Sequence, residues 1–211
     1  MKNIQKNILI STGPTIVYID PVRYISNISS GKMGLAFVNA FLERQSNVKV
    51  VSGKVDFSYP QNQKLQVFNV ETNQQMLENL EQHFDWADVF ISIAAVVDFE
   101  PVIIQTNKIK KSDETFCLEM KKSVDILKTL SSRKKPNQTI IGFALETEDL
   151  LENAKSKLEA KNLDFIVANK AKESMGLDTA RVLLISKDGS IKQFETKNKI
   201  ELAGEILDFI F

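Results

Sequence analysis

The chain has 211 residues, of which 43% are hydrophobic, and its 27 basic and 27 acidic side chains give a formal net charge of zero. This length predicts one domain over residues 1–211 with one substantial core, and the charge balance supplies no basic field for nucleic acid or an anionic membrane surface. A single cysteine, Cys117, and a single histidine, His83, exclude a disulfide framework, a Cys/His zinc cage and a triad with a histidine base.

Short apolar runs separated by helical patterns follow one another along the chain. They predict strands near residues 7, 48, 65, 88, 139 and 164, and because these runs are apolar on both faces, a parallel sheet covered by helices on both sides. Helical stripes begin near Gly31 (Met33, Phe37, Ala40, Phe41) and recur in the last helix (Ala203, Ile206, Leu207, Ile210).

Two regions break this rhythm. Residues 99–123 include the strand-like segment "TFCLEM", which predicts a half-buried, structural Cys117, and residues 181–195 predict a hairpin around Asp188-Gly189. The fold class expected is therefore a single-domain, Rossmann-like α/β protein with a mainly parallel sheet and antiparallel additions. No apolar run approaches the ~18 residues of a membrane span, so a soluble protein is expected.

The loop after the first strand is unusually long. It begins with Gly13 and Thr15 and reaches the next helix through "SSGK", where Ser29 or Ser30 could cap the helix and Gly31 and Lys32 could admit an anion. The alternative is a capped helix with a glycine for close packing. Neither a Walker A motif nor G-x-G-x-x-G fits the spacing.

Ligands of such sheets bind beyond the carboxyl ends of the strands. The loops after Thr12, Ile93, Ala144 and Ala168 are therefore expected at one rim. Five segments that include these loops, "STGPTIVYIDPVRYISNISSGKMG", "AAVVDFEP", "KIKK", "GFALET" and "KNLDFIVAN", occur in the order and spacing of phosphopantothenoylcysteine synthetase, which the chain resembles from about residue 7 to its end.

The resemblance implies a ligase of coenzyme A biosynthesis. Members activate 4'-phosphopantothenate with a nucleoside triphosphate, usually CTP, to an acyl-cytidylate and pyrophosphate, after which the amine of L-cysteine displaces CMP. It also implies Mg²⁺ bound with the triphosphate, a cytoplasmic location and a homodimer with shared active sites. No protein nucleophile is needed for either step; positioned cations and amide donors are.

Three residues are expected to be catalytic through this resemblance. Lys108 matches a flap lysine that neutralises charge at the reacting carboxyl and α-phosphate, and Asn27 matches the asparagine that orients the acyl-nucleotide. Arg23 could bind phosphate or carboxylate, or else pair with Asp20 in its own loop. Lys110 and Lys111 favour a solvated basic segment instead.

The nucleotide site implied by the resemblance draws on several segments. Lys157 and Lys161 lie four apart on one helical face, with no acid at i−4 of Lys157, so the two charges repel each other when no anion is near. The resemblance matches both to lysines that contact the triphosphate, and the alternative is a solvated helical face. Phe143 is expected to stack on the base, with a buried strand-end Phe as the alternative, and Asp98 to contact the nucleotide or cap the next segment. The full set is Ser92, Ile93, Ala94, Asp98, Lys108, Val124, Asp125, Ile126, Leu127, Phe143, Lys157 and Lys161.

The chain departs from the family pattern in three places. Ser123-Val124 replaces Asn-Pro in the nucleotide loop, Met175 and Ala180 replace Phe and Asn, and Val97 replaces an alanine. The residues show no carboxylate cluster for a metal, which is compatible with Mg²⁺ bound mainly through phosphates.

Two other functions stay open: a Rossmann-like oxidoreductase using NAD(P) or flavin, and a non-catalytic nucleotide-binding regulatory homologue.

Overall fold

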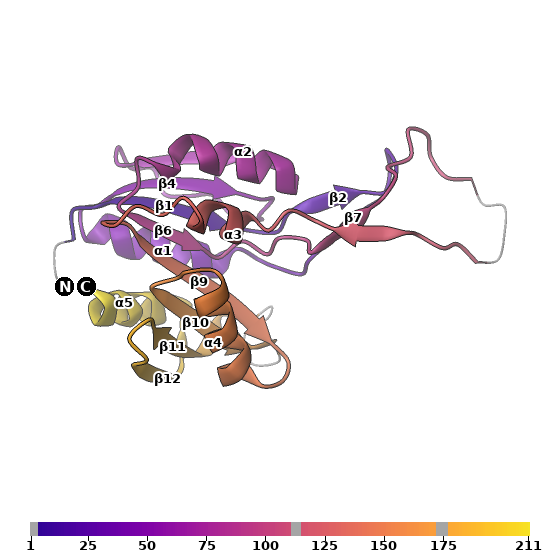
Figure 1. The fold of residues 1–211 in the computed structure, drawn as a ribbon. Coiled ribbons are helices and arrows are strands. Elements are labelled where there is room, and N and C mark those ends of the chain that lie inside the picture. The colour runs from indigo at the N-terminus through magenta and orange to yellow at the C-terminus, as the bar shows by residue number, and fades with distance from the viewer. Residues whose placement is uncertain (1–3, 111–114, 172–176) are drawn as a thin grey trace.

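The protein is built on one eight-stranded sheet (Figure 1). A computed structural model describes residues 4–110, 115–171 and 177–211. The strand order is β12-β11-β10-β9-β6-β1-β4-β5, and the six strands from β10 to β5 are mutually parallel. Their bounds are β1 Asn7–Thr12, β4 Asn47–Ser52, β5 Leu65–Asn69, β6 Val89–Ser92, β9 Thr139–Glu146 and β10 Phe165–Lys170.

The antiparallel addition lies at one edge of the sheet. Strands β11 (Thr179–Ser186) and β12 (Ile191–Asn198) form a hairpin whose turn contains Gly189 at φ +89°, and β11 pairs antiparallel with β10. These strands, with the six parallel ones, confirm the expected fold class.

Helices cover both faces of the sheet because alternate strand side chains point to opposite sides. On one face, Ile8 and Ile10 of β1 belong to a core with α1 (Lys32–Glu43) and α5 (Lys199–Ile210). On the other face, Leu9 belongs to a core with α2 (Asn73–Phe84), α3 (Ile126–Ser131) and α4 (Leu150–Ala160). The helical stripe residues Phe37, Phe41 and Ile206 are fully buried, as their spacing predicts.

The sheet reverses its direction of growth beside β1. The chain adds β4 and β5 on one side of β1 and then returns to place β6 on the other side. Loops that leave β1 and β6 therefore diverge at their carboxyl ends, which is where open α/β sheets bind ligands. An isolated β-bridge between Pro14 and Ala95 joins these two loops to each other. A second one, between Ile16 and Thr72, joins the loop after β1 to the start of α2.

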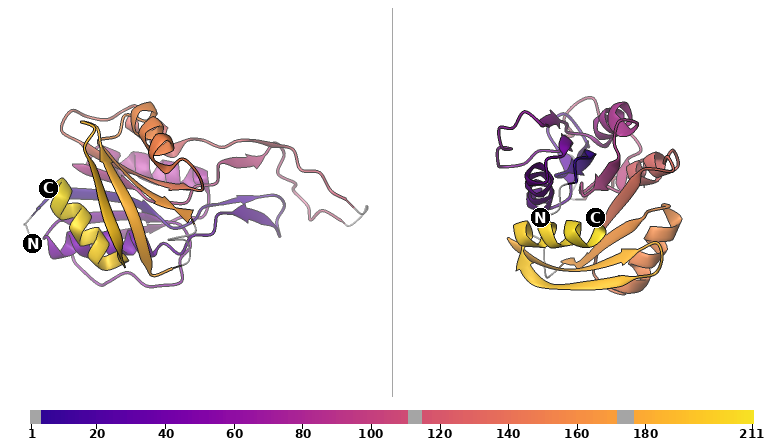
Figure 2. Two further views of the ribbon diagram at one scale, coloured as in Figure 1. Left: turned by 90° about the horizontal axis from the view of Figure 1, so that it is seen from below. Right: turned by 90° about the vertical axis from the view of Figure 1, so that its left-hand side faces the viewer.

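An elongated arm extends from the body beside this point (Figures 1 and 2). It contains two small antiparallel pairs, β2 (Ile16–Tyr18) with β3 (Tyr24–Ser26), and β7 (Phe99–Pro101) with β8 (Met120–Lys122). The long loop expected after the first strand is thus partly a hairpin.

The prediction for "TFCLEM" is wrong. Only Met120 of that segment enters a strand, and Cys117 is exposed, because β8 begins later than the apolar alternation suggests. Residues 115–119 run along the arm, where no second layer covers them from within the described chain. His83, the single histidine, lies in α2.

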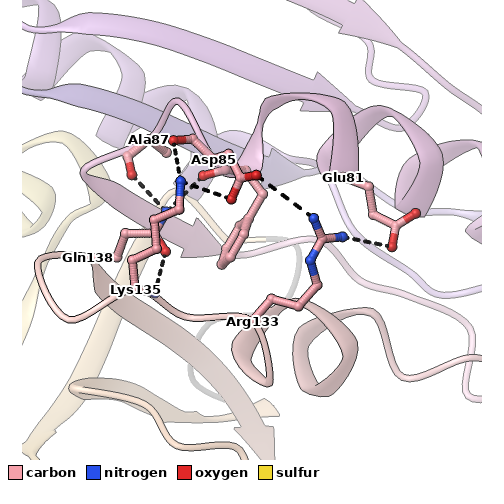
Figure 3. Close-up of polar contacts among 7 residues, drawn as sticks. Glu81, Asp85, Ala87, Arg133, Lys135 and Gln138 are labelled. Carbon is pink, nitrogen blue, oxygen red and sulfur yellow. Dashed lines mark hydrogen bonds and ion pairs between the residues drawn. The ribbon is translucent and has the colours of Figure 1, made fainter.

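The opposite end of the sheet is held by a polar network between α2 and the segment before β9 (Figure 3). Gln138 is buried and donates to the carbonyls of Phe84 and Ala87 at 2.8 and 2.9 Å. Lys135 pairs with Asp85 at 3.1 Å, and Arg133 with Glu81 at 3.3 Å. These contacts fix the amino ends of β6 and β9 and leave their carboxyl ends for the site. Within the described residues, no helix combines the length and apolarity needed to cross a membrane.

Candidate functional site

A pocket of about 360 Å³ opens at the carboxyl ends of β6 and β9, on the face covered by α3 and α4. Its walls come from four separate parts of the chain, which the fold brings together beside the reversal point of the sheet. The lining residues are Ser92, Ala94, Val96, Val97, Asp98, Phe99, Lys122, Ser123, Val124, Asp125, Ile126, Leu127, Phe143, Lys157, Lys161, Leu163 and Ile166. Ten of the twelve residues expected at a nucleotide are among them, and Ile93 and Lys108 are not.

The wall formed by residues 94–98 is held from outside by three side chains. The buried hydroxyl of Thr15 accepts from the Val97 amide at 3.1 Å, and Asn73 Nδ2 donates to the Val97 carbonyl at 2.8 Å. Asn27 Nδ2 donates to the Val96 carbonyl, also at 2.8 Å. This wall is therefore fixed before any ligand arrives.

Gly13 supports the same wall from the turn after β1. Its carbonyl accepts from the Ala95 amide at 2.9 Å, and its φ of +72° is a conformation that favours glycine. A Cβ at this position would lie 3.0 Å from the Gly53 carbonyl oxygen. Gly13 and Thr15 thus contact the pocket wall rather than the pocket space.

Asn73 was not expected at the site. It is the first residue of α2, buried at 3% exposure, and follows the capping box formed by Thr72 and Gln75. The sequence signal there indicates only a helix start. Asn73 and Val97 are 24 residues apart in the sequence, and their contact depends on how α2 packs, so no local sequence pattern could have revealed it.

Two lysines of α4 line the pocket, and each has a carboxylate partner. Lys157 Nζ lies 2.6 Å from Glu146 Oε1, and Lys161 Nζ lies 3.0 Å from Asp125 Oδ2. Local helical spacing gives no sign of these partners, because they come from other elements, at the end of β9 and at the start of α3. A triphosphate would therefore compete with these carboxylates or bind the remaining ammonium hydrogens.

The pocket also contains an aromatic ring and a buried hydroxyl. Phe143 is half-buried and meets the Phe37 ring edge to face at 5.5 Å between centroids. The hydroxyl oxygen of Ser123 is buried and, among the described residues, has no hydrogen-bond partner. Ser123 is one of the departures from the family pattern, and its amide donates to the Asp98 carbonyl at 2.8 Å, which joins two pocket walls.

Asp98 and Asp125 are the carboxylates of the pocket. Asp125 caps α3, accepting from the Lys128 amide at 3.0 Å. Asp98 is exposed, and the segment after it is the strand β7 rather than a helix, so the alternative of a cap does not apply. Among the described residues, no group of three His, Cys, Asp or Glu side chains could hold a metal ion.

Lys108 lies on the arm, outside this pocket. It is exposed and lines a separate hollow of about 420 Å³ with Val102, Ile103, Gln105, Asn107, Ile109, Phe116, Cys117, Leu118 and Glu119. Lys110 is exposed nearby, and Lys111 and Met175 fall outside the described residues. Ala180 is buried in β11.

Arg23 makes the ion pair that the sequence left as an alternative. Its Nη1 lies 2.9 Å from Oδ2 of Asp20, whose side chain is fully buried. The Asp20 carboxylate also accepts from the backbone amides of Val22, Arg23 and Ile109. Burial alone would raise the pKa of Asp20, but the three amides and the Arg23 charge outweigh it and leave that pKa below its usual value.

The start of α1 differs from the prediction. Gly31, at φ +70°, holds the N-cap position, so neither Ser29 nor Ser30 caps the helix; the Ser29 hydroxyl instead accepts from the Gly31 amide at 3.4 Å. The left-handed turn at Gly31 explains the difference, because it directs the preceding serines away from the first turn. Lys32 Nζ lies 2.6 Å from Asp178, and this bond lowers the pKa of the Asp178 carboxyl.

The fold and the pocket define a Rossmann-like α/β protein with a polar, ligand-sized site at the reversal point of its sheet. The chain belongs to the family described as the DNA/pantothenate metabolism flavoprotein C-terminal domain, whose model matches residues 4–211.

Several known proteins are similar to the chain. It is 39% identical over 208 residues to the coenzyme A biosynthesis bifunctional protein CoaBC of Bacillus subtilis, covering 97% of this chain and 51% of that protein. It is 40% identical over 205 residues to a cysteine/cysteine sulfinic acid decarboxylase of an unknown prokaryotic organism, covering 96% and 57%. The crystal structure of the C-terminal domain of a CoaBC protein superimposes with a TM-score of 0.84 at 37% identity, covering 100% of this chain and 96% of that one. The chain thus spans about half the length of the curated relatives it matches.

Proposed function

We propose that the protein is a phosphopantothenate–cysteine ligase acting in the cytoplasm on 4'-phosphopantothenate, L-cysteine and a nucleoside triphosphate, with CTP favoured. The observation that carries the proposal is the single pocket in which ten of the twelve expected nucleotide residues meet. Membership of the family and similarity to CoaBC proteins support it.

The proposed first step is nucleotide transfer to the carboxylate. A carboxylate oxygen of 4'-phosphopantothenate attacks the α-phosphorus of CTP, the bond to the β-phosphate oxygen breaks, and pyrophosphate leaves. Lys157 and Lys161 offer positive charge to the phosphates, Phe143 offers a ring face to the base, and Lys108 on the arm offers charge to the reacting carboxyl. In the second step the cysteine amine attacks the acyl carbon, loses a proton and displaces CMP.

Magnesium fits this site through the nucleotide. Asp98 is an exposed carboxylate of the pocket and, unlike Asp125, neither caps α3 nor pairs with Lys161, so it could contribute one oxygen ligand, while the phosphates and water would supply the rest. The ion would supply charge neutralisation on the triphosphate when bound.

The proposal is tested by measuring pyrophosphate. The protein is mixed with 4'-phosphopantothenate, Mg²⁺ and either CTP or ATP, with and without L-cysteine. Pyrophosphate should appear in both cases, limited to about one equivalent per site without cysteine and continuing with it. Binding of NAD(P) or flavin without any nucleotide-dependent release of pyrophosphate would favour the oxidoreductase. Binding of the nucleotide without turnover would favour the regulatory homologue.

Asn27 is proposed to act in the second step. Its Nδ2 bond to Val96 holds the amide behind the wall of residues 94–98, outside the pocket lining, so this role requires the acyl group to lie on that side of the wall, where the amide can orient it and stabilise charge on the carbonyl oxygen. Asn27→Ala should slow displacement by cysteine by about a hundredfold and cause acyl-nucleotide to accumulate, as followed by mass spectrometry of quenched reactions. Asn62→Ala, in the exposed turn before β5, is the control. An unaffected second step in Asn27→Ala would remove this role.

The arm is proposed to form a homodimer. Large apolar side chains are exposed along it, including Tyr24, Ile28, Ile103 and Phe116 at 56, 80, 67 and 61% exposure. Several exposed apolar side chains on one arm favour a partner, here a second copy. Sedimentation equilibrium should give twice the mass of the chain, and Ile103→Glu should shift it toward the monomer.

A further inference from the structure

A clamp joins the hairpin β2–β3 to the segment that carries Lys108. The Asp20 carboxylate, buried in the hairpin turn, accepts from the Ile109 amide at 3.1 Å. Arg23 Nη2 donates to the Ile109 carbonyl at 3.3 Å. Both backbone polar groups of the residue that follows Lys108 are therefore bound from the hairpin.

The two carboxylate oxygens of Asp20 accept hydrogen bonds from different groups. Oδ1 accepts from the amides of Val22 and Arg23 at 2.8 and 2.9 Å, which closes the hairpin turn. Oδ2 accepts from Arg23 Nη1 at 2.9 Å and from the Ile109 amide at 3.1 Å, and the second bond joins the hairpin to the segment that carries Lys108. One carboxylate thus couples the shape of the turn to the position of Ile109.

Within the described residues, the segment that carries Lys108 has few other contacts to the rest of the protein. Residues 102–108 are exposed, and Ile109 is half-buried. One further contact, from the Gln105 amide to the Ile19 carbonyl at 2.9 Å, again joins the segment to the hairpin. The position of Lys108 relative to the body is therefore set mainly through the turn that Asp20 organises.

We propose that Asp20 is a positioning residue, which acts through Arg23 and Ile109 to fix the place from which Lys108 reaches the reacting carboxyl. The role of Lys108 rests on the proposed function. Asp20 is fully buried, and its oxygens are bound by backbone amides and by Arg23, so we place it outside the substrate contacts and assign its effect on turnover to Lys108. The entropic cost of holding the ammonium in place is then offset during folding rather than during substrate binding.

The variant Asp20→Asn separates the two functions of the carboxylate. An amide whose oxygen stays at the Oδ1 position keeps the turn bonds to Val22 and Arg23. Its NH₂ group then faces the Ile109 amide and the Arg23 guanidinium, both donors, so both hydrogen bonds of Oδ2 are lost, including the one to Ile109. Asp208→Asn is a matched control, because Asp208 Oδ1 also pairs with an arginine, the buried Arg44, at 2.6 Å but between α5 and α1.

The first measurement is independent of activity. Amide hydrogen exchange in a peptide covering residues 104–110 should speed up at least about tenfold in Asp20→Asn and stay unchanged in Asp208→Asn, because the Ile109 amide loses its acceptor only in the former. Equal protection in wild type and Asp20→Asn would overturn the clamp, whatever reaction the protein catalyses.

The second measurement asks whether Asp20 acts through Lys108. Asp20→Asn should lower the rate of pyrophosphate release about tenfold with the CTP dissociation constant unchanged, and in a Lys108→Ala background it should cost less than about twofold, since coupled residues are not additive. A full tenfold loss in both backgrounds, or a weakened CTP affinity, would refute positioning through Lys108. If wild type releases no pyrophosphate, the ligase assignment fails while the exchange result still decides the clamp.

Discussion

Lys108→Ala should lower the rate of pyrophosphate release by about a hundred- to a thousandfold, because the variant removes the ammonium proposed to neutralise charge as the carboxyl becomes a mixed anhydride. The CTP dissociation constant should change little, since Lys108 lies on the arm and outside the pocket that collects the other nucleotide residues. Rapid quench of a single turnover gives the rate, and isothermal titration calorimetry gives the affinity.

Lys110→Ala is the matched control for this prediction. Lys110 carries the same charge two residues along and is exposed, so its removal should lower the rate less than about threefold if only Lys108 reaches the reacting groups. Similar losses in the two variants would indicate a diffuse basic field, and a small effect of Lys108→Ala would contradict the assigned role.

Gly34→Ala should destabilise the protein by about 3 kcal/mol or prevent folding. A Cβ on Gly34 would lie 2.0 Å from Oγ1 and 2.4 Å from Cβ of Thr12, a fully buried residue at the end of β1. Helix α1 would have to move away from the sheet, which also moves Gly31 and the turn after β1. The free energy of unfolding in urea measures the effect.

A second helical glycine gives the opposite expectation. The nearest heavy atom to a Cβ on Gly204, in α5, is Arg44 Nη2 at 3.9 Å, so Gly204→Ala fits without displacement. It should raise the free energy of unfolding by about 0.5–1 kcal/mol, the propensity difference between the two residues in a helix. Equal effects of the two substitutions would show that α1 does not depend on its close approach to Thr12.

The sequence predicts the body of the fold well and the arm poorly. Runs such as that of β1 are apolar on both faces and bounded by turn residues, so a buried strand can be predicted from the sequence alone. Strands β2 and β3 have three residues each and carry exposed side chains such as Tyr24, so periodicity gives no signal. The same reason explains Cys117, whose alternating neighbours lie on an arm and cover no core.

The candidate site shows a similar division. The resemblance of short segments to the family indicates which residues should lie together at the nucleotide, and most of them line the same pocket. Their partners could not be predicted: Glu146 reaches Lys157, and Asn73 reaches Val97, through the packing of α4 and α2 rather than through local spacing. The helix that begins near Gly31 agrees with the prediction, but its N-cap residue does not, because a positive φ at one glycine changes which residue occupies the cap.

The most direct test of the central claim uses 4'-phosphopantothenate labelled with ¹⁸O in both carboxyl oxygens. If the carboxylate attacks the α-phosphorus of CTP, one labelled oxygen must leave with the nucleotide when the amide forms. Mass spectrometry should then find CMP carrying one ¹⁸O and the amide product carrying the other. Amide formed together with unlabelled CMP, or with no nucleoside monophosphate from any nucleotide supplied, would contradict the acyl-nucleotide route and the site built around it.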